Sequence, residues 1–392
     1  MIIVEKSKCC GCRACLQICP KKAISTYYDK YGFEQIMIDE QKCVHCNKCK
    51  TVCPILNPNK NESRYSCGSA YSKDSTIKQS GASGGLFGEF ARQVIEDGGV
   101  VYGAAFDNNL QLKTTRASSL NQLYALYKSK YLLCDTSTAF SRIKKDLDNN
   151  TKVMYCSSPC QIAALRNYLH NNYTNLLCVE FVCHGVGSQK HFADSISYVE
   201  KKKGIKILKY RFREKYKNAS SHYYSYKYKN QKNSMIGIKR DIYMTFPYYY
   251  AYQERINCRD SCYDCVYATE TRTADITIGD FHDILKYEPK VDRFAGVSMF
   301  VCNTNVGQEF FDRLKDRLII KEYDWNTIKI NNRFSGTEQI PNFRSNYLEL
   351  IASNQFERAN QIYLNYKKDW RYYYYHTPKI VRDIGNKILR RK

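Results

Sequence analysis

Two cysteine runs, CCGCRACLQICP at residues 9–20 and CVHCNKCKTVCP at residues 43–54, decide the fold of the first part of this chain. Counted from Cys9 and from Cys43, each run has the spacing C-x2-C-x2-C-x3-C-P, and the second run follows the first by 34 residues. A cubane iron–sulfur cluster needs four thiolates around one small volume, and gaps of two residues let a tight loop supply three of them. The repeat therefore predicts two [4Fe-4S] clusters.

The fourth cysteine of each run determines how the ligands are shared. In the two-cluster pattern of bacterial ferredoxins, this cysteine serves the other cluster. The alternatives, a pair of zinc sites or a disulfide framework, fit less well because zinc ligands usually come as two separated pairs. The expected ligand sets are Cys9, Cys12, Cys15 and Cys53 for one cluster, and Cys43, Cys46, Cys49 and Cys19 for the other.

Composition limits the cellular location and the partners that can be expected for this chain. The chain has 392 residues, 19 of them cysteine, and a formal net charge of +23. We find no secretion signal and no apolar stretch that could span a membrane, so we expect a cytoplasmic protein whose thiols bind metal. Each oxidised cluster subtracts about two charge units, which leaves the chain basic and favours acidic partners. Nucleic acid is the least supported partner, since only the charge points to it.

The segments after residue 57 predict an α/β core. Residues 55–66 are polar and are expected to form a linker. The alternation that follows is typical of a largely parallel sheet. Strands are expected at residues 99–106, 152–157 and 176–183, and helices at 84–96, 136–147, 160–169 and 189–203.

Residues 205–246 have a different pattern. The tyrosine-rich stretches 223–228 and 235–243 flank a polar turn and predict an antiparallel hairpin. Alternating Tyr and Lys is also found where single-stranded nucleic acid stacks, but a half-buried hairpin is the favoured interpretation. The expected fold class is α+β and α/β: a dicluster ferredoxin-like module, a mixed-sheet α/β flavin-binding core and a helical C-terminal segment.

A glycine-rich turn, SGASGG at residues 80–85, leads into one of the expected helices. Backbone N–H groups at such a turn can approach an anion, and the helix dipole favours the negative charge. The turn matches neither the dinucleotide fingerprint nor the P-loop, so phosphate binding is one hypothesis beside an ordinary turn. Asp275 and Asp280, at the ends of another expected strand, could position a ring or a water molecule, but we favour turn residues.

Four further cysteines could hold a third cluster. Cys160 and Cys183 each follow an expected strand, and if these strands are parallel neighbours, both thiols reach the carboxyl edge of the sheet. Cys262 and Cys265 add a C-x2-C pair, for which Cys258 is a rival because it extends the spacing to C-x3-C-x2-C. The alternative is that Cys160 and Cys183 are buried structural thiols.

Several stretches of the sequence, which include the glycine-rich turn and the four cysteines, together resemble the family of the coenzyme F420-reducing hydrogenase beta subunit and its dehydrogenase relatives. The resemblance covers about residues 67–310, which we divide into parts at 67–148 and 150–310. A module at 1–57 precedes it, and a helical basic region at 311–392 follows. The similar stretches are SGASGGLF at 80–87, GGVVYGAAFD at 98–107, SKY at 129–131, SPCQIAAL at 158–165, VCHGVGS at 182–188, SCYDC at 261–265 and ADITIGDF at 274–281.

The resemblance implies an FAD site and a third [4Fe-4S] cluster. The sequence departs from the family pattern at Ser157-Ser158, at His282-Asp283 and at Cys134, so the substrate is not fixed by it. The implied cluster ligands are Cys160, Cys183, Cys262 and Cys265, and the implied flavin contacts are Ser83, Gly84, Gly85 and Lys130.

The implied function is that of an iron–sulfur flavoprotein oxidoreductase. It would couple hydride transfer at FAD to one-electron transfer with a redox protein such as ferredoxin, or with a partner oxidoreductase subunit. Relatives often occur with surface-polysaccharide biosynthesis genes, which suggests a sugar or lipid-linked substrate; coenzyme F420 is a further candidate. The alternative is an electron-transfer relay subunit without a substrate site.

The C-terminus is basic from residue 367 onward. After Pro378, apolar residues recur at helical spacing on one side of this segment. Such a helix could lie on an anionic membrane surface, dock an acidic partner or pack on its own domain, and the last is the default. The apolar positions are Ile380, Val381, Ile384, Ile388 and Leu389.

Overall fold

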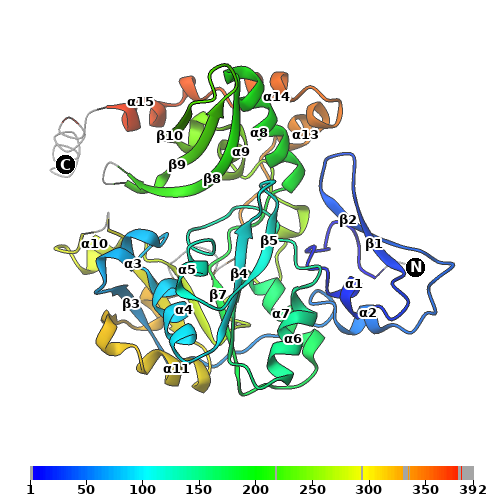
Figure 1. The fold of residues 1–392 in the computed structure, drawn as a ribbon, viewed down its shortest axis with the longest axis vertical. Coiled ribbons are helices and arrows are strands. Elements are labelled where there is room, and N and C mark those ends of the chain that lie inside the picture. The colour runs from blue at the N-terminus through cyan, green and yellow to red at the C-terminus, as the bar shows by residue number, and fades with distance from the viewer. Residues whose placement is uncertain are drawn as a thin grey trace.

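The computed structural model describes residues 3–216, 219–292, 295–329, 334, 336–377 and 381. Figure 1 shows a small N-terminal module beside a central sheet domain, with a second, smaller sheet and the C-terminal helices above. Among the residues so described, no helix is both long and apolar enough to cross a membrane. The predicted basic helix after Pro378 lies outside them, apart from Val381.

The N-terminal module is built from two similar halves. In the first cysteine run Gly11 and Arg13 have positive φ, and in the second His45 and Asn47 do. A short helix starts directly after each pair, so the sequence repeat is also a repeat of backbone conformation. An antiparallel hairpin joins the halves. The elements are α1 (Ala14–Ile18), β1 (Ile24–Tyr28), β2 (Glu34–Ile38) and α2 (Lys48–Thr51).

An eight-stranded sheet forms the central domain, in the order β13-β3-β12-β11-β7-β6-β4-β5. The four strands from β11 to β4 are parallel, and each outer pairing is antiparallel. The prediction of a mixed α/β sheet is therefore confirmed. The strands are β3 (Ser66–Ser72), β4 (Val100–Phe106), β5 (Leu112–Ala117), β6 (Val153–Ser157), β7 (Leu176–Phe181), β11 (Ile276–Asp280), β12 (Ser298–Cys302) and β13 (Leu318–Glu322).

Helices cover both faces of this sheet. On one face α6 (Ala139–Asp148) and α7 (Pro159–Leu169) pack against β4 and β6, and α1 of the N-terminal module joins the same cluster. On the other face α4 (Leu86–Glu96) and α11 (Asn305–Asp312) pack against β4, β6 and β12. Burial on both faces explains why the parallel strands are apolar nearly throughout. The remaining helices of the domain are α3 (Ser75–Ser80), α5 (Leu120–Leu123), α10 (Ile284–Tyr287) and α12 (Trp325–Lys329).

The sheet draws one edge strand from beyond residue 310, where we expected the helical C-terminal region to begin. β13 pairs antiparallel with β3, and α11 runs across residue 310. Packing and pairing are therefore continuous from β3 to β13.

The smaller sheet has the order β10-β9-β8. β9 and β10 pair antiparallel as the expected hairpin, and β8 is a third strand. Its inner face is packed with rings such as Tyr210, Phe212 and Tyr224, so the tyrosines serve a core. The elements are α8 (Gln189–Lys203), β8 (Ile205–Tyr216), β9 (Ala219–Asn230), β10 (Ile236–Ile242), α9 (Pro247–Gln253), α13 (Arg344–Ala352), α14 (Phe356–Tyr363) and α15 (Trp370–His376).

Candidate iron–sulfur and flavin centre

The second cysteine run forms an outer site. A small cavity is lined by four thiols of one expected ligand set, three from a single loop and Cys19 from the first run. Cys46 is exposed to solvent. This donor set, three thiols from a wrapping loop and one from elsewhere, fits a cubane. The four residues are Cys19, Cys43, Cys46 and Cys49.

The first cysteine run forms an inner site. Burial, followed by the neighbouring thiols of Cys9 and Cys53, raises the pKa of Cys15. Burial likewise raises the pKa of Cys12 and of Cys53. Thiols in such a place stay protonated without metal, so cluster binding must release their protons. These are the four thiols of the other expected set, and the two sets adjoin through Cys49, which also acts on Cys15.

The inner site is fixed against the central domain by hydrogen bonds to its own loop. Arg259 Nε donates to Cys9 O at 2.5 Å, and Thr136 Oγ1 donates to Cys12 O at 2.6 Å. Gln17 Nε2 donates to Thr136 O at 2.9 Å. The loop that would hold the inner cluster is therefore itself the contact between the two domains.

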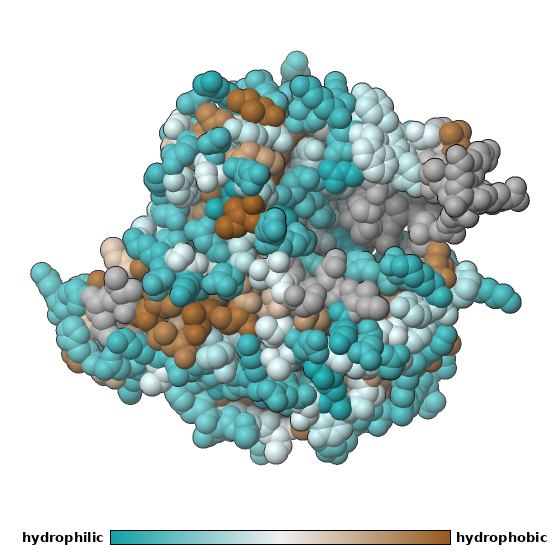
Figure 2. All heavy atoms as spheres, turned by 180° about the vertical axis from the view of Figure 1, so that it is seen from behind, coloured by the Kyte–Doolittle hydropathy of each residue, from teal (hydrophilic) through white to brown (hydrophobic). Residues whose placement is uncertain are grey.

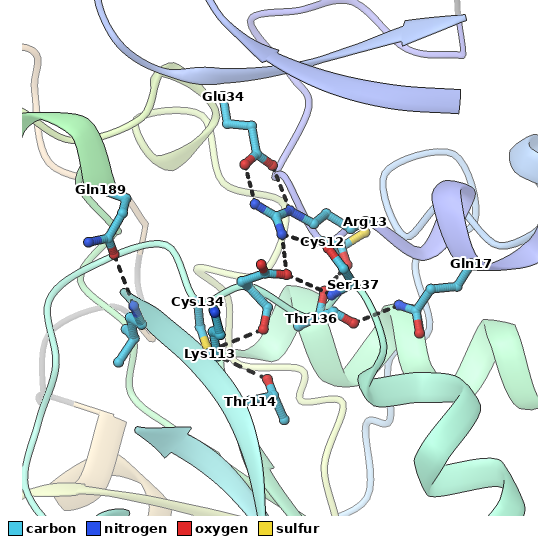
Figure 3. Close-up of polar contacts among 12 residues, drawn as sticks. Cys12, Arg13, Gln17, Glu34, Lys113, Thr114, Cys134, Thr136, Ser137 and Gln189 are labelled. Carbon is cyan, nitrogen blue, oxygen red and sulfur yellow. Dashed lines mark hydrogen bonds and ion pairs between the residues drawn. The ribbon is translucent and has the colours of Figure 1, made fainter. Parts of the chain in front are cut away.

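Arg13 adds an ion-pair network to this contact (Figure 3). Its guanidinium lies between Glu34 of the module and Asp135 of the central domain, and pairs with both. Arg13 Nη1 also donates to Ser137 Oγ at 2.6 Å. Burial opposes ionisation of Asp135, but Arg13 overcomes it and holds the pKa of this carboxyl below its usual range. The network thus ties the module to the domain by buried charge.

A second small cavity, of about 40 Å³, lies where the module meets the domain. The four thiols expected for a third cluster all line it. Tyr267 also lines it and donates from its hydroxyl to Pro54 O at 2.7 Å, directly after Cys53. The lining cysteines are Cys160, Cys183, Cys262 and Cys265, together with Cys10, which the sequence did not single out.

Strand topology explains how distant cysteines meet here. β6 and β7 are parallel neighbours, so the segments after them leave the sheet at the same edge. Cys160 is the second residue of α7, just after β6, and Cys183 lies two residues beyond β7. Burial, followed by Cys258 and Cys183, raises the pKa of Cys262. Cys258 is thus close to Cys262 but does not line the cavity, which favours Cys265 over this rival.

A much larger cavity, of about 430 Å³, opens on the other side of the same sheet edge. The glycine-rich turn forms part of its wall through Ser83 and Gly85, and Lys130 lines it as well. Gly85 has φ +92° and begins α4, a conformation that favours glycine. Its size and the turn at a helix start fit a flavin nucleotide.

Gly84 faces away from this cavity. Its N–H donates to Ser298 Oγ at 2.9 Å, and a Cβ added there would lie 2.6 Å from Ala70 O. The amide is therefore engaged by the sheet, and the residue packs the turn onto β3 and β12. Three of the four implied flavin contacts line the cavity, and Gly84 supports them from behind.

Two half-buried lysines hold the loops around the cavity. Lys130 Nζ donates to the carbonyls of Leu126 and Tyr127 at 2.8 and 2.7 Å. Lys215 Nζ donates to Ser83 O at 2.7 Å and to Ala295 O at 2.8 Å, which anchors the glycine-rich turn. Burial lowers the pKa of each of these lysines to about 7. Both can therefore change charge near neutral pH.

The two aspartates of the 274–281 segment have different surroundings. Asp275 accepts hydrogen bonds from Cys178 N at 2.7 Å and from Arg166 Nη2 at 3.1 Å, which is a structural role. Asp280 lines the large cavity and forms a bidentate pair with Arg213 at 2.7 and 3.1 Å. Burial opposes its ionisation, yet Arg213 keeps the pKa of Asp280 below its usual range. The cavity thus contains a fixed ion pair.

Four of the five positions at which the sequence departs from the family pattern gather around this cavity; the fifth, Asp283, is not in its lining. Ser157 ends β6 and Ser158 follows it, Cys134 comes from the segment before α6, and His282 follows β11. All four line the large cavity, so they can alter which substrate enters it.

Comparison with known proteins gives a family for this architecture. Residues 8–56 match a 4Fe-4S dicluster domain, and residues 150–326 match the family described as the C terminus of the coenzyme F420 hydrogenase/dehydrogenase beta subunit. Residues 150–326 thus carry the C-terminal region of this beta-subunit family. The dicluster domain precedes the family region. No curated protein matches the chain.

One solved structure similar to this chain is a chain of the F420-reducing [NiFe] hydrogenase complex from Methanosarcina barkeri, studied by xenon derivatization. The two chains share 14% identity with a TM-score of 0.41. The match covers 76% of this chain and 91% of the hydrogenase chain.

The affinity for FAD is expected to fall as the pH rises through 7. Below that pH Lys130 is an ammonium ion that would attract the pyrophosphate of a flavin in this cavity, and a bound anion would raise its pKa. Binding above pH 7 must then take up a proton, so the Kd rises by up to about tenfold per pH unit. Flavin fluorescence titrations at about pH 6 and about pH 9 measure this difference.

In Lys130→Met the pH dependence should flatten. An undiminished slope in that variant would assign the titration to Lys215 instead. Without a bound anion, the effect of pH on stability has the opposite direction. Between the pKa values of Lys130 in the folded protein and in the unfolded chain, about 7 and 10.5, the folded protein binds fewer protons at this lysine. The free energy of unfolding therefore increases as the pH rises through that range.

Proposed function

We propose that this chain is an iron–sulfur flavoprotein oxidoreductase in which three clusters connect a protein partner to an FAD site. The main observation behind the proposal is that the small thiol cavity and the large cavity share a wall. Cys183, Gly185 and Val186 line both the small thiol cavity and the large cavity, and so does Ser158. A cluster in the first and a flavin in the second would be separated by these residues alone.

The four sites form a sequence from the surface inward. The outer site has the exposed Cys46, and it adjoins the inner site through Cys49. The inner site adjoins the third through Cys10 and Tyr267. The third adjoins the large cavity through Cys183. This order supports a continuous electron path with its entry at the module and its end at the flavin.

A flavin supplies the conversion between two-electron exchange with a substrate and one-electron exchange with a cluster. For each hydride exchanged, two electrons therefore cross the clusters one at a time. The residues that would hold the group are Ser83 and Gly85 at the turn, Lys130 and the Arg213–Asp280 pair, which all line the cavity.

The resemblance gives two candidate substrates, coenzyme F420 and a sugar or lipid-linked intermediate of surface-polysaccharide synthesis. Charge on the cavity wall supports an anionic substrate. Lys128, Arg213 and Arg255 line the cavity, and Asp280 is its lining carboxylate. The basic wall adds long-range attraction for such a molecule.

The surface around the outer site suits an acidic one-electron carrier such as a ferredoxin. Val44 beside Cys46 is 55% exposed, and the module around these two residues carries exposed lysines. Charge complementarity of this kind accelerates encounter. Figure 2 shows an apolar, brown area on the left, the side on which the module lies in that view. The exposed lysines of this part of the module are Lys21, Lys22, Lys42, Lys48 and Lys50.

Rapid mixing tests the function and the entry point together. A reduced, acidic bacterial-type ferredoxin should bleach the flavin absorption of the anaerobic protein. In the double variant Lys21→Glu/Lys48→Glu, the second-order rate constant should fall about tenfold at low ionic strength and approach the wild-type value at high salt. Lys227→Glu/Lys229→Glu, the same charge change on β9, should keep the wild-type rate.

Two outcomes would contradict the proposal. A protein that binds three clusters but no flavin would be a relay subunit. Equal slowing by both double variants would show that net charge, and not the surface around Cys46, governs the encounter.

A further inference from the structure

Cys10 is the one cysteine of the two runs that belongs to neither expected ligand set. It stands between Cys9 and Cys12, where the second run has Val44. Its side chain is buried, with 8% exposed. It lines the small thiol cavity and belongs to the cluster of side chains that packs α1 against α7. The residue is therefore inside the contact between module and domain.

The Cys10 side chain packs with two other cysteines in one buried cluster. One is Cys12, an expected ligand of the inner cluster, and the other is Cys160, an expected ligand of the third, which lines the small thiol cavity together with Cys10. These two ligands come from different domains and are far apart in sequence. A single side chain thus adjoins one expected ligand of each of two adjacent sites.

The backbone on both sides of Cys10 is held in place. Cys9 O accepts from Arg259, and Cys12 O accepts from Thr136, so the central domain clamps the loop at both ends. Between them Gly11 has φ +71°, and a Cβ there would lie 2.8 Å from Leu133 Cδ2. This packing holds the Cys10 thiol next to Cys12 and Cys160.

We propose that Cys10 is a positioning residue that donates its S–H to a ligand sulfur of the inner or of the third cluster and thereby sets the reduction potential of that cluster. A reduced cluster carries one more negative charge than an oxidised one, and a hydrogen bond to a thiolate sulfur stabilises the more negative state. The donor therefore raises the potential. For the third cluster the inference rests on the proposed function.

The test compares Cys10→Ala with Cys10→Ser in the full, anaerobically reconstituted chain. Iron content should stay at about twelve atoms per chain in both variants, because Cys10 is not a ligand. EPR-monitored redox titration should show a more negative potential for the inner cluster, the third cluster or both in Cys10→Ala. The expected change in the one-electron equilibrium constant is about tenfold, or about 59 mV.

Two controls separate tuning from damage. Cys10→Ser keeps a donor in place, so its potentials should return toward the wild-type values. Cys302→Ala removes a buried thiol from β12, away from the clusters, and should change none of the potentials. The outer cluster serves as an internal reference in every variant.

Three results would overturn the inference. Unchanged potentials in Cys10→Ala would show that the thiol tunes nothing. Equal shifts in the Ala and Ser variants would show a packing effect. Loss of about four iron atoms in both would make Cys10 a ligand. A wild-type protein with only about eight iron atoms per chain would show that the third cluster does not form. That result would contradict the proposed function, and the iron content alone distinguishes it from the three results above.

Discussion

Replacement of Cys265 by serine is expected to lower the iron content from about twelve atoms per chain to about eight. Cys265 lines the small thiol cavity and takes no part in either site of the module. The third cluster should therefore be lost while the EPR signals of the other two remain. Iron analysis and EPR after anaerobic reconstitution measure both effects.

Loss of the third cluster should also separate the module from the flavin. In Cys265→Ser, reduced ferredoxin should still reduce the two clusters of the module, but flavin bleaching on the same timescale should disappear. The reason is that Cys183, the cysteine common to both cavities, would then have no cluster beside it.

Cys258→Ser is the matched control. This cysteine is buried and adjoins Cys262, but it does not line the cavity. It should keep about twelve iron atoms. The opposite pattern, with iron lost in Cys258→Ser and kept in Cys265→Ser, would make the rival spacing correct.

A phenylalanine at Gly103 is expected to abolish FAD binding while iron stays at about twelve atoms. Gly103 lies on β4 and lines the large cavity, and a Cβ there would come no closer than 3.5 Å to Leu126. The first side-chain atom is therefore tolerated, and a ring must occupy the cavity. Flavin released by acid precipitation and measured by absorbance gives the stoichiometry.

Gly103→Ala should retain stoichiometric FAD, since it adds only the tolerated carbon. A Gly103→Phe protein with full flavin content would place the cofactor elsewhere. Gly84 would be a poor choice for this test, because a Cβ there would lie within 2.8 Å of backbone atoms on both β3 and β12. Flavin loss in a Gly84 variant would report damage to the sheet.

Much of the core could be predicted because local pattern and topology agree. The strands expected at 152–157 and 176–183 correspond to β6 (Val153–Ser157) and β7 (Leu176–Phe181). Their parallel pairing brings Cys160 and Cys183 to one edge, as strand order predicts. Their role as cluster ligands, with that of the module's eight cysteines, stays a prediction for iron analysis to decide.

Other features depend on contacts that no local pattern records. β8 was not expected as a strand, because bulges at Ile207/Lys209 and Arg211/Glu214 break its alternation. Cys10 stands out only once the module is docked on α7. The direction of Gly84 depends on β12, more than 200 residues later. Lys130 and Lys215 have pKa values near 7 because of their burial, which the amino-acid composition cannot show.

The clamp on the first cysteine run has a kinetic consequence. Many redox modules move between a donor and an acceptor on a flexible tether, and their turnover then depends on that motion and on solvent viscosity. Here Arg259 and Thr136 donate hydrogen bonds to backbone carbonyls of the cluster loop itself, and Arg13 adds partly buried ion pairs. The module is therefore held in one position on the domain, and in the proposed function the arrival of the carrier would limit the rate of electron delivery.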